Sequence, residues 1–91
     1  MTSDTRRPIR VGIIDSGINS RQAKLVAASV NFTADQNSNS VADKLGHGEA
    51  LAEIILTTAD TSEVHVARVF DDRLTCSATR VSEAIFWLCE Q

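Results

Sequence analysis

The chain has 91 residues, 43% hydrophobic and 23% charged, and twelve acidic against nine basic residues give a formal net charge of −3. This composition fits at most one globular domain and argues against disorder along most of the chain. Because it has no long basic run, no apolar run of about 18 residues and no signal-peptide pattern, we expect no nucleic-acid or membrane partner and a cytoplasmic location.

The first predicted element is a strand over residues 9–15, IRVGIID, a short apolar run rich in β-branched residues. Turn-forming residues follow it in Ser16-Gly17, and such a run is typical of a strand buried on both faces. Asp15 is therefore expected at the carboxyl end of this strand. Residues 1–8 are expected to form a flexible lead-in.

A weaker strand is predicted over residues 26–32, followed by a polar surface loop over residues 33–44. From Gly46 the pattern becomes helical, which places His47 at the amino end of a helix. The apolar positions that recur at helical spacing there are Leu51, Ile54, Ile55 and Thr58.

A third strand is predicted over residues 63–70, and His65 within it is expected to be a satisfied strand histidine. A second helix follows, with Thr79 as its amino cap. Its apolar stripe consists of Val81, Ala84, Ile85 and Leu88. Alternating strands and helices predict an α/β fold with a parallel, doubly wound sheet and right-handed crossovers.

Asp15 is the first candidate functional residue, because ligands of open α/β sheets bind beyond the carboxyl ends of the strands. A strand-end aspartate followed by Ser-Gly suits several roles. It could be a phosphoacceptor, a metal ligand, a cap for the following turn, or the carboxylate that orients a catalytic histidine.

His47 is the second candidate, flanked by Gly46 and Gly48 at a helix start. Glycines there let another backbone or a substrate approach the imidazole closely. One interpretation is a polar residue that faces solvent. The other is a general base, since a buried carboxylate on Nδ1–H would leave Nε2 free to take a proton.

Three segments, taken in order, resemble subtilisin-like serine proteases. VGIIDSGI, residues 11–18, is similar to the family's aspartate motif, and Gly46-His47-Gly48 is similar to its histidine motif. Residues 66–91 resemble the strand, substrate-binding loop and helix that come next. The resemblance implies that residues 1–91 are the amino-terminal part of one subtilisin-type domain, whose sheet is incomplete in this chain, with Asp15 and His47 as two members of the triad.

The same resemblance implies that residues 74–78 line the substrate groove and pair with an extended peptide. The residues of this segment are Leu74, Thr75, Cys76, Ser77 and Ala78. Asp71-Asp72, which open the loop, are expected to be solvated turn residues. Cys76 and Cys89 are expected to be free thiols, and neither a metal nor another cofactor is expected.

The chain also departs from the family pattern. Glu49 and Ala50 stand where the family has Thr-His, and Glu49 could either raise the imidazole pKa or cap the helix. None of the serines has the context of the family's nucleophile, and Ser16 is expected to close the turn after Asp15. The implied partners are a polypeptide substrate and the remaining carboxy-terminal part of the protease domain.

The leading hypothesis is therefore a serine endopeptidase that acts by acyl transfer, with residues 1–91 inactive alone. A dedicated peptide-processing role is the expected use of this activity. An alternative is a non-catalytic module that grips an extended peptide. A third, a phosphoacceptor or nucleotide-binding domain, is disfavoured because no Gly-rich phosphate loop is present.

Overall fold

The computed structural model describes residues 8–33, 40–59 and 62–91. Its elements in chain order are β1 (Arg10–Asp15), α1 (Ser20–Ala23), β2 (Ala28–Asn31), α2 (His47–Thr58), β3 (Glu63–Arg68) and α3 (Ala78–Cys89). Apart from Pro8, the expected lead-in lies outside the described residues, as do residues 34–39 of the expected polar loop.

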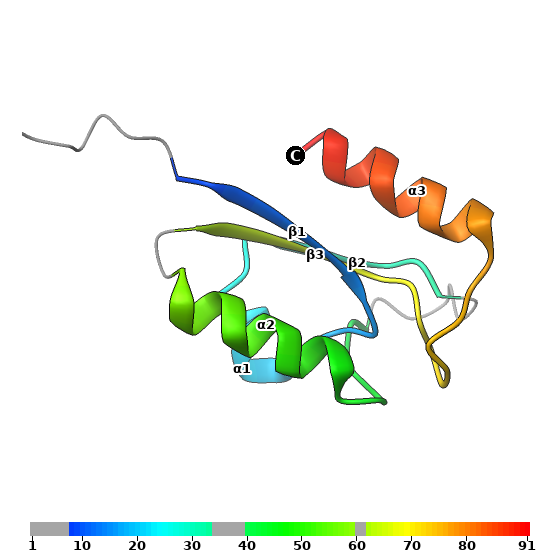
Figure 1. Ribbon diagram of the computed structural model, residues 1–91, viewed down its shortest axis with the longest axis horizontal. Helices are drawn as coiled ribbons and strands as arrows, with labels where there is room; N and C mark the ends of the chain where they lie inside the picture. Colours follow the sequence, from blue (N-terminus) through cyan, green and yellow to red (C-terminus); the bar gives the residue numbers. More distant parts are fainter. Residues whose placement is uncertain (1–7, 34–39, 60–61) are drawn as a thin grey trace, which may run out of the picture.

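The three strands form one parallel sheet in the order β1-β3-β2 (Figure 1). In this register Asp15 of β1 and Asn31 of β2 both lie opposite Arg68 of β3. The carboxyl ends of all three strands therefore meet at one edge of the sheet. The predicted α/β fold with a parallel sheet is confirmed.

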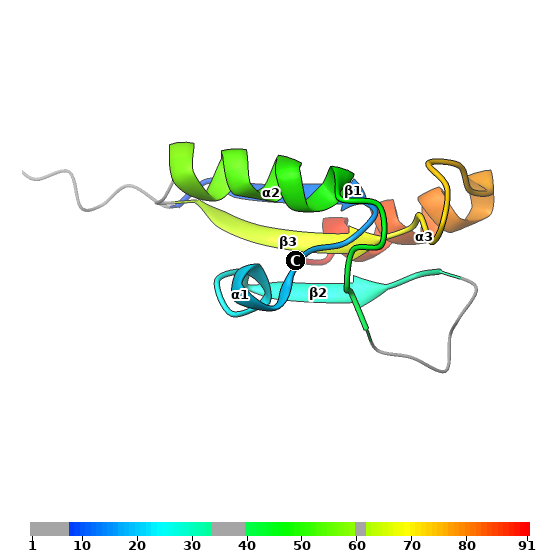
Figure 2. The same cartoon turned by 90° about the horizontal axis from the view of Figure 1, so that it is seen from below.

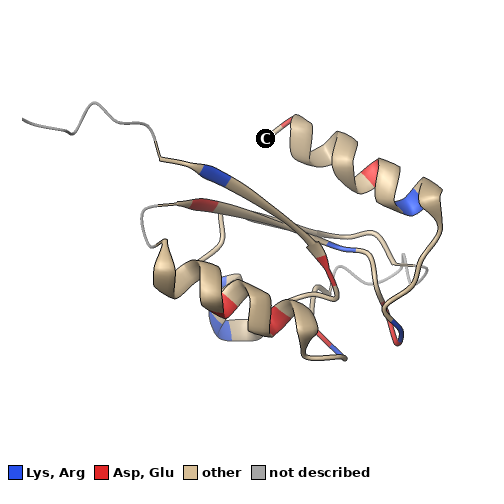
Figure 3. Cartoon of the chain, viewed as in Figure 1, with Lys and Arg blue, Asp and Glu red and all other residues tan. Residues whose placement is uncertain are grey.

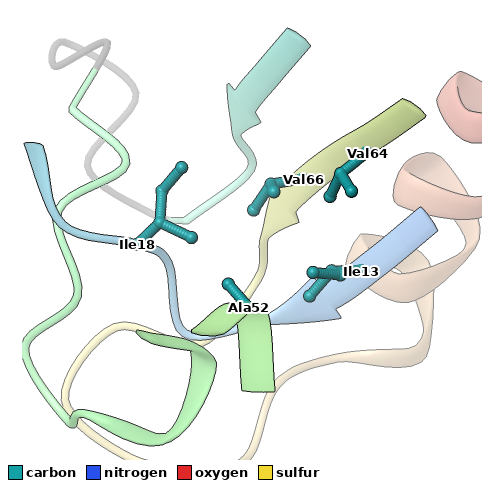
Figure 4. Packing of buried hydrophobic residues seen from close by; sticks show 5 residues of the cluster. All are labelled: Ile13, Ile18, Ala52, Val64 and Val66. Carbon is teal, nitrogen blue, oxygen red and sulfur yellow. The ribbon is translucent and has the colours of Figure 1, made fainter. Parts of the chain in front are cut away.

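Helices cover both faces of this sheet, with α2 on one side and α3 on the other (Figures 1 and 2). The core beneath α2 contains Ile13, Ile18, Ala52, Val64 and Val66 (Figure 4). The core beneath α3 contains Ala67, Val69 and Ala84. Successive side chains of a strand point to opposite faces, so β3 supplies residues to both cores. Within the described segments, none of the helices combines the length and the apolarity needed to cross a membrane.

Several predicted boundaries are corrected. The second strand is shorter than predicted and the third ends at Arg68. α1 was not predicted. Thr79 is not the amino cap of α3, because the Ser77 hydroxyl accepts a hydrogen bond from the Arg80 amide at 3.1 Å and the helix begins at Ala78. Ser77 has the extended backbone that an amino cap requires.

The predicted apolar stripes are partly wrong. Ile54 is 62% exposed and Ile85 is 49% exposed, whereas Ala52 and Ala84 are completely buried. Both alanines belong to the cores on which their helices pack, whereas neither isoleucine is among the side chains packed against those cores. A small side chain lets a helix axis come close to the sheet.

Candidate active site

Asp15 is the last residue of β1, and only 6% of its side chain is exposed. Its Oδ1 atom accepts a hydrogen bond from the Ser16 amide at 2.7 Å. Its own carbonyl oxygen accepts bonds from the Val69 amide at 2.8 Å and the Phe70 amide at 3.3 Å. The end of β1 is thus attached to the end of β3, which fixes the carboxylate at the carboxyl edge of the sheet.

His47 is the first residue of α2, and its Nδ1 atom lies 2.8 Å from Oδ2 and 2.9 Å from Oδ1 of Asp15. An ionised carboxylate only accepts hydrogen bonds, so Nδ1 carries the proton of this contact. In neutral His47 the lone pair is then on Nε2. Because 59% of the His47 side chain is exposed, the ring can reach a reactant. The structure brings the two predicted catalytic residues together.

The amino end of α2 is held against the turn that follows β1. The Gly48 amide donates a hydrogen bond to the Ser16 hydroxyl at 2.9 Å. A Cβ atom on Gly48 would lie 2.3 Å from the carbonyl oxygen of Gly17, closer than any real Cβ contact. Glycine at position 48 thus permits another backbone to approach, as expected from the sequence. Gly46 has a φ of 84°, a left-handed conformation that favours glycine.

Asp43 stabilises the start of α2 from outside the helix, whose amino cap Gly46 has no side chain. The Asp43 carboxylate accepts hydrogen bonds from the Leu45 and Glu49 amides, both at 2.9 Å. Burial raises the pKa of Asp43, but the bonds from Glu49, Leu45 and the Ser16 hydroxyl outweigh it and hold the pKa below 3.8. Sequence reasoning missed this residue, although an aspartate just ahead of a helix is a common capping pattern.

Glu49 lies in the first turn of α2, where the helix dipole favours an anion. Its carboxylate accepts a hydrogen bond from the Asn19 side chain at 2.9 Å, and its carbonyl oxygen accepts one from the Gln22 side chain at 2.9 Å. These bonds attach α1 to α2. In its described contacts, the Glu49 side chain makes no capping hydrogen bond to α2, so of its two predicted roles the helix cap is replaced by a bond to Asn19.

Of the five residues predicted to line a substrate groove, the first four lie between β3 and α3 and the fifth begins α3. Leu74 and Thr75 are exposed, whereas Cys76 packs against the core beneath α3. Ser77 caps α3 and Ala78 is its first residue. In the described part of the chain, therefore, only Leu74 and Thr75 are neither packed in the core nor part of the start of α3.

Asp71 and Asp72 were both expected to be solvated turn residues. Asp72 is exposed, whereas Asp71, with 34% of its side chain exposed, also forms ion pairs. The Oδ1 atom of Asp71 lies 2.9 Å from Lys44 Nζ and 3.0 Å from a terminal nitrogen of Arg68. The hydrogen bond from Lys44, aided by the charge of Arg68, holds the pKa of Asp71 below 3.8. Arg68 was not predicted as a site residue, although a lone arginine within an apolar strand needs a partner.

His65 is buried, and its Nε2 atom lies 2.8 Å from a carboxylate oxygen of Glu63. Its Nδ1 atom is buried without a hydrogen-bond partner among the described residues, so the expected satisfaction is only partial. Cys76 and Cys89 are free thiols, as predicted. The described segments contain no group of three or more His, Cys, Asp or Glu side chains that could hold a metal ion.

No family model matches the chain, and no curated protein matches it. The functional argument therefore depends on the geometry of Asp15 and His47.

Proposed function

We propose that residues 1–91 contribute the orienting aspartate and the general base of a subtilisin-like serine endopeptidase. The observation that carries this proposal is the contact between His47 Nδ1 and the carboxylate of Asp15 at 2.8 Å and 2.9 Å. It joins a buried acid to an exposed imidazole. A serine protease needs this arrangement to hold the tautomer and stabilise the imidazolium.

In the proposed reaction, His47 takes the proton of a serine hydroxyl as that oxygen attacks the scissile carbonyl of a polypeptide. His47 then gives the proton to the leaving amine, and water hydrolyses the acyl-enzyme by the same route. Asp15 stays ionised throughout. The nucleophile is supplied by a serine outside residues 1–91, in the remaining carboxy-terminal part of the domain.

Ser16 is next to Asp15 in sequence but is a poor candidate for the nucleophile. It is completely buried, and its hydroxyl accepts the hydrogen bond of the Gly48 amide at 2.9 Å. A substrate carbonyl could reach this oxygen only if α2 moved away from the turn. Ser16 instead supports the position of His47.

A catalytic role is favoured over the alternative of a peptide-binding module without activity. Gripping an extended peptide requires a groove and an exposed backbone edge, but no buried carboxylate on a histidine. The structure places the buried Asp15 carboxylate on Nδ1 of a largely exposed histidine, an arrangement that a general base uses and a peptide-binding module does not need. A cytoplasmic location and a peptide-processing role remain predictions from the sequence.

A fluorophosphonate probe tests this proposal on the full-length protein, with the labelled residue identified by mass spectrometry. We expect labelling of one serine outside residues 1–91, and we expect His47→Ala to slow it at least 100-fold, on the order of the contribution of a general base. Glu83→Gln, a change on the exposed face of α3, serves as the control and should label normally. Labelling that does not depend on His47, or no labelling at all, would rule out the proposed mechanism.

A further inference from the structure

Arg68 is a buried cation at the carboxyl end of β3, with only 3% of its surface exposed. Its Nε atom donates a hydrogen bond to the Ser16 carbonyl oxygen at 3.2 Å, and a terminal nitrogen donates one to Asp71 at 3.0 Å. A buried charge is costly unless it is paired and hydrogen-bonded. A terminal nitrogen also donates a longer bond to the Ser40 carbonyl oxygen at 3.5 Å. Arg68 thus obtains partners from the turn after Asp15, the stretch before α2 and the loop after β3.

Asp71 adds an ion pair between this network and the stretch before α2. Its carboxylate also binds Lys44 at 2.9 Å, in the stretch that leads into His47. Figures 1 and 2 both place the amino end of α2 and the β3–α3 loop at the same end of the molecule. The charges of Arg68, Asp71 and Lys44 thus join the segments that carry Asp15 and His47 to the loop that presents Leu74. Elsewhere on the ribbon, acidic and basic residues are interspersed (Figure 3).

The far end of the loop is anchored separately. A terminal nitrogen of Arg80 donates a hydrogen bond to the Val69 carbonyl oxygen at 2.9 Å, and the Ser77 hydroxyl caps α3. Between the two anchors, Arg73, Leu74 and Thr75 are exposed. The loop is therefore fixed at both ends and presents its middle to solvent.

We propose that Arg68 and Asp71 are positioning residues, a clamp that fixes residues 72–77 relative to the Asp15–His47 pair. The clamp holds this loop in one position near the base, so that the loop is ready to bind a polypeptide. Its consequence for catalysis rests on the proposed function, but the clamp itself does not. Ordering the loop in advance lowers the entropy lost when substrate binds, so the clamp acts on substrate binding and not on the chemical step.

Limited trypsin digestion of the full-length protein tests the clamp without any assay of activity. Trypsin cleaves after Arg73, in the clamped loop, and after Lys24, an exposed residue in the turn after α1 that serves as an internal reference. Peptides from both bonds are quantified by mass spectrometry. We expect Asp71→Asn to raise the cleavage rate after Arg73 about tenfold relative to that after Lys24, because cleavage follows the population of the opened loop.

Two further variants cover the case in which Asp71→Asn does not fold. Lys44→Met removes an exposed partner and should raise the same ratio about twofold to threefold, as befits a partly exposed ion pair. Arg68→Lys keeps the charge, and its cleavage ratio should lie between those of the wild type and Asp71→Asn. Glu83→Gln should change nothing. Equal acceleration at both bonds, or an unchanged ratio in Lys44→Met and Asp71→Asn, would overturn the clamp.

Steady-state peptide cleavage gives a second test. Asp71→Asn should raise KM about tenfold and leave kcat within about twofold, since the loop holds substrate while the Asp15–His47 contact persists. A fall in kcat at constant KM would contradict the clamp. If the full-length protein cleaves no peptide, the proposed function fails and the trypsin ratio alone decides on the clamp.

Discussion

The backbones of Gly48 and Gly17 are so close that a Cβ atom on Gly48 would lie 2.3 Å from the Gly17 carbonyl oxygen and 2.8 Å from its amide nitrogen. Both neighbours are main-chain atoms, which cannot rotate away as a side chain could. The hydrogen bond from the Gly48 amide to Ser16 lies in the same contact. The position of His47, one residue earlier, therefore depends on the absence of a side chain at position 48.

Gly48→Ala should lower the free energy of unfolding by about 2 kcal/mol or more, because overpacking against backbone forces α2 to shift. The control is Gly46→Asn. No atom lies within 4 Å of a Cβ placed at Gly46, and asparagine tolerates the left-handed backbone there. Gly46→Asn should lower the free energy of unfolding by less than about 1 kcal/mol. Urea denaturation measures both, and wild-type stability in Gly48→Ala would mean that the two backbones are further apart.

The contact between Asp15 and His47 predicts that the two residues act as a unit in catalysis. In the full-length protein, Asp15→Ala and His47→Ala should each lower kcat on a peptide substrate on the order of 10⁴-fold. The double variant should be no worse than the poorer single variant, because removing one member already disables the other. Additive losses would argue against a coupled pair, and near-normal turnover in either single variant would remove that residue from the mechanism.

Much of this site could be predicted, because its two central residues lie at element boundaries that the sequence marks clearly. Asp15 ends an apolar run, and His47 begins a helical pattern between two glycines. The residues that hold Asp15 and His47 in place were not predicted, because they contact partners that are distant in sequence. Arg68 meets Ser16 only after β3 pairs with β1, and nothing in its local sequence indicates that pairing.

Asp43 predicts a specific loss of stability in acid. A carboxylate whose pKa is lower in the folded than in the unfolded state stabilises the fold above about pH 4 and loses this effect as the pH falls through the folded value. Asp43→Asn should be less stable than wild type at pH 6, by about 1 kcal/mol as for a lost helix cap, and should lose less stability on acidification. Urea denaturation at pH 6 and pH 3 tests this, with Asp72→Asn as the exposed control. Equal acid sensitivity in the wild type and Asp43→Asn would show that Asp43 does not stabilise the helix start.

The fold was predictable to the level of strand and helix types, but not to that of pairing order. The apolar run of residues 9–15 and the helical spacing after Gly46 indicate a parallel α/β sheet. No local feature says that β3 lies between β1 and β2. One feature of the sequence does indicate α1: Asn19 and Gln22 have the spacing of a capping box, and in the structure they form one around its first turn.

Residues 1–91 alone should neither hydrolyse peptides nor react with a fluorophosphonate probe, because the proposed nucleophile lies outside them. Incubation of the purified fragment with the probe, followed by gel fluorescence and mass spectrometry, measures this, and trypsin serves as the labelling control. A labelled serine within residues 1–91 would show that the fragment carries its own nucleophile.

The same fragment is expected to associate, though not for the reason that its strand residues suggest. The sequence pattern predicts that part of Val11, Ile13, Val66 and Val69 lies bare in an incomplete sheet. The structure corrects this, because Ile13, Val66 and Val69 are buried beneath the two helices. What remains open are the outer edges of β1 and β2, each paired only with β3 in the described sheet, and the outer surfaces of the helices.

Large apolar side chains occupy those surfaces, with Phe86 of α3 at 74% exposure and Ile54 of α2 at 62%. Unpaired strand edges and exposed apolar side chains favour association. We therefore expect purified residues 1–91 to melt at low temperature, and to self-associate or to be stabilised by the proposed carboxy-terminal part of the domain. Sedimentation velocity measures association, and Phe86→Ser separates the two causes, since association through strand edges would persist in this variant. A monodisperse fragment that melts cooperatively at high temperature would show that residues 1–91 form a self-sufficient domain.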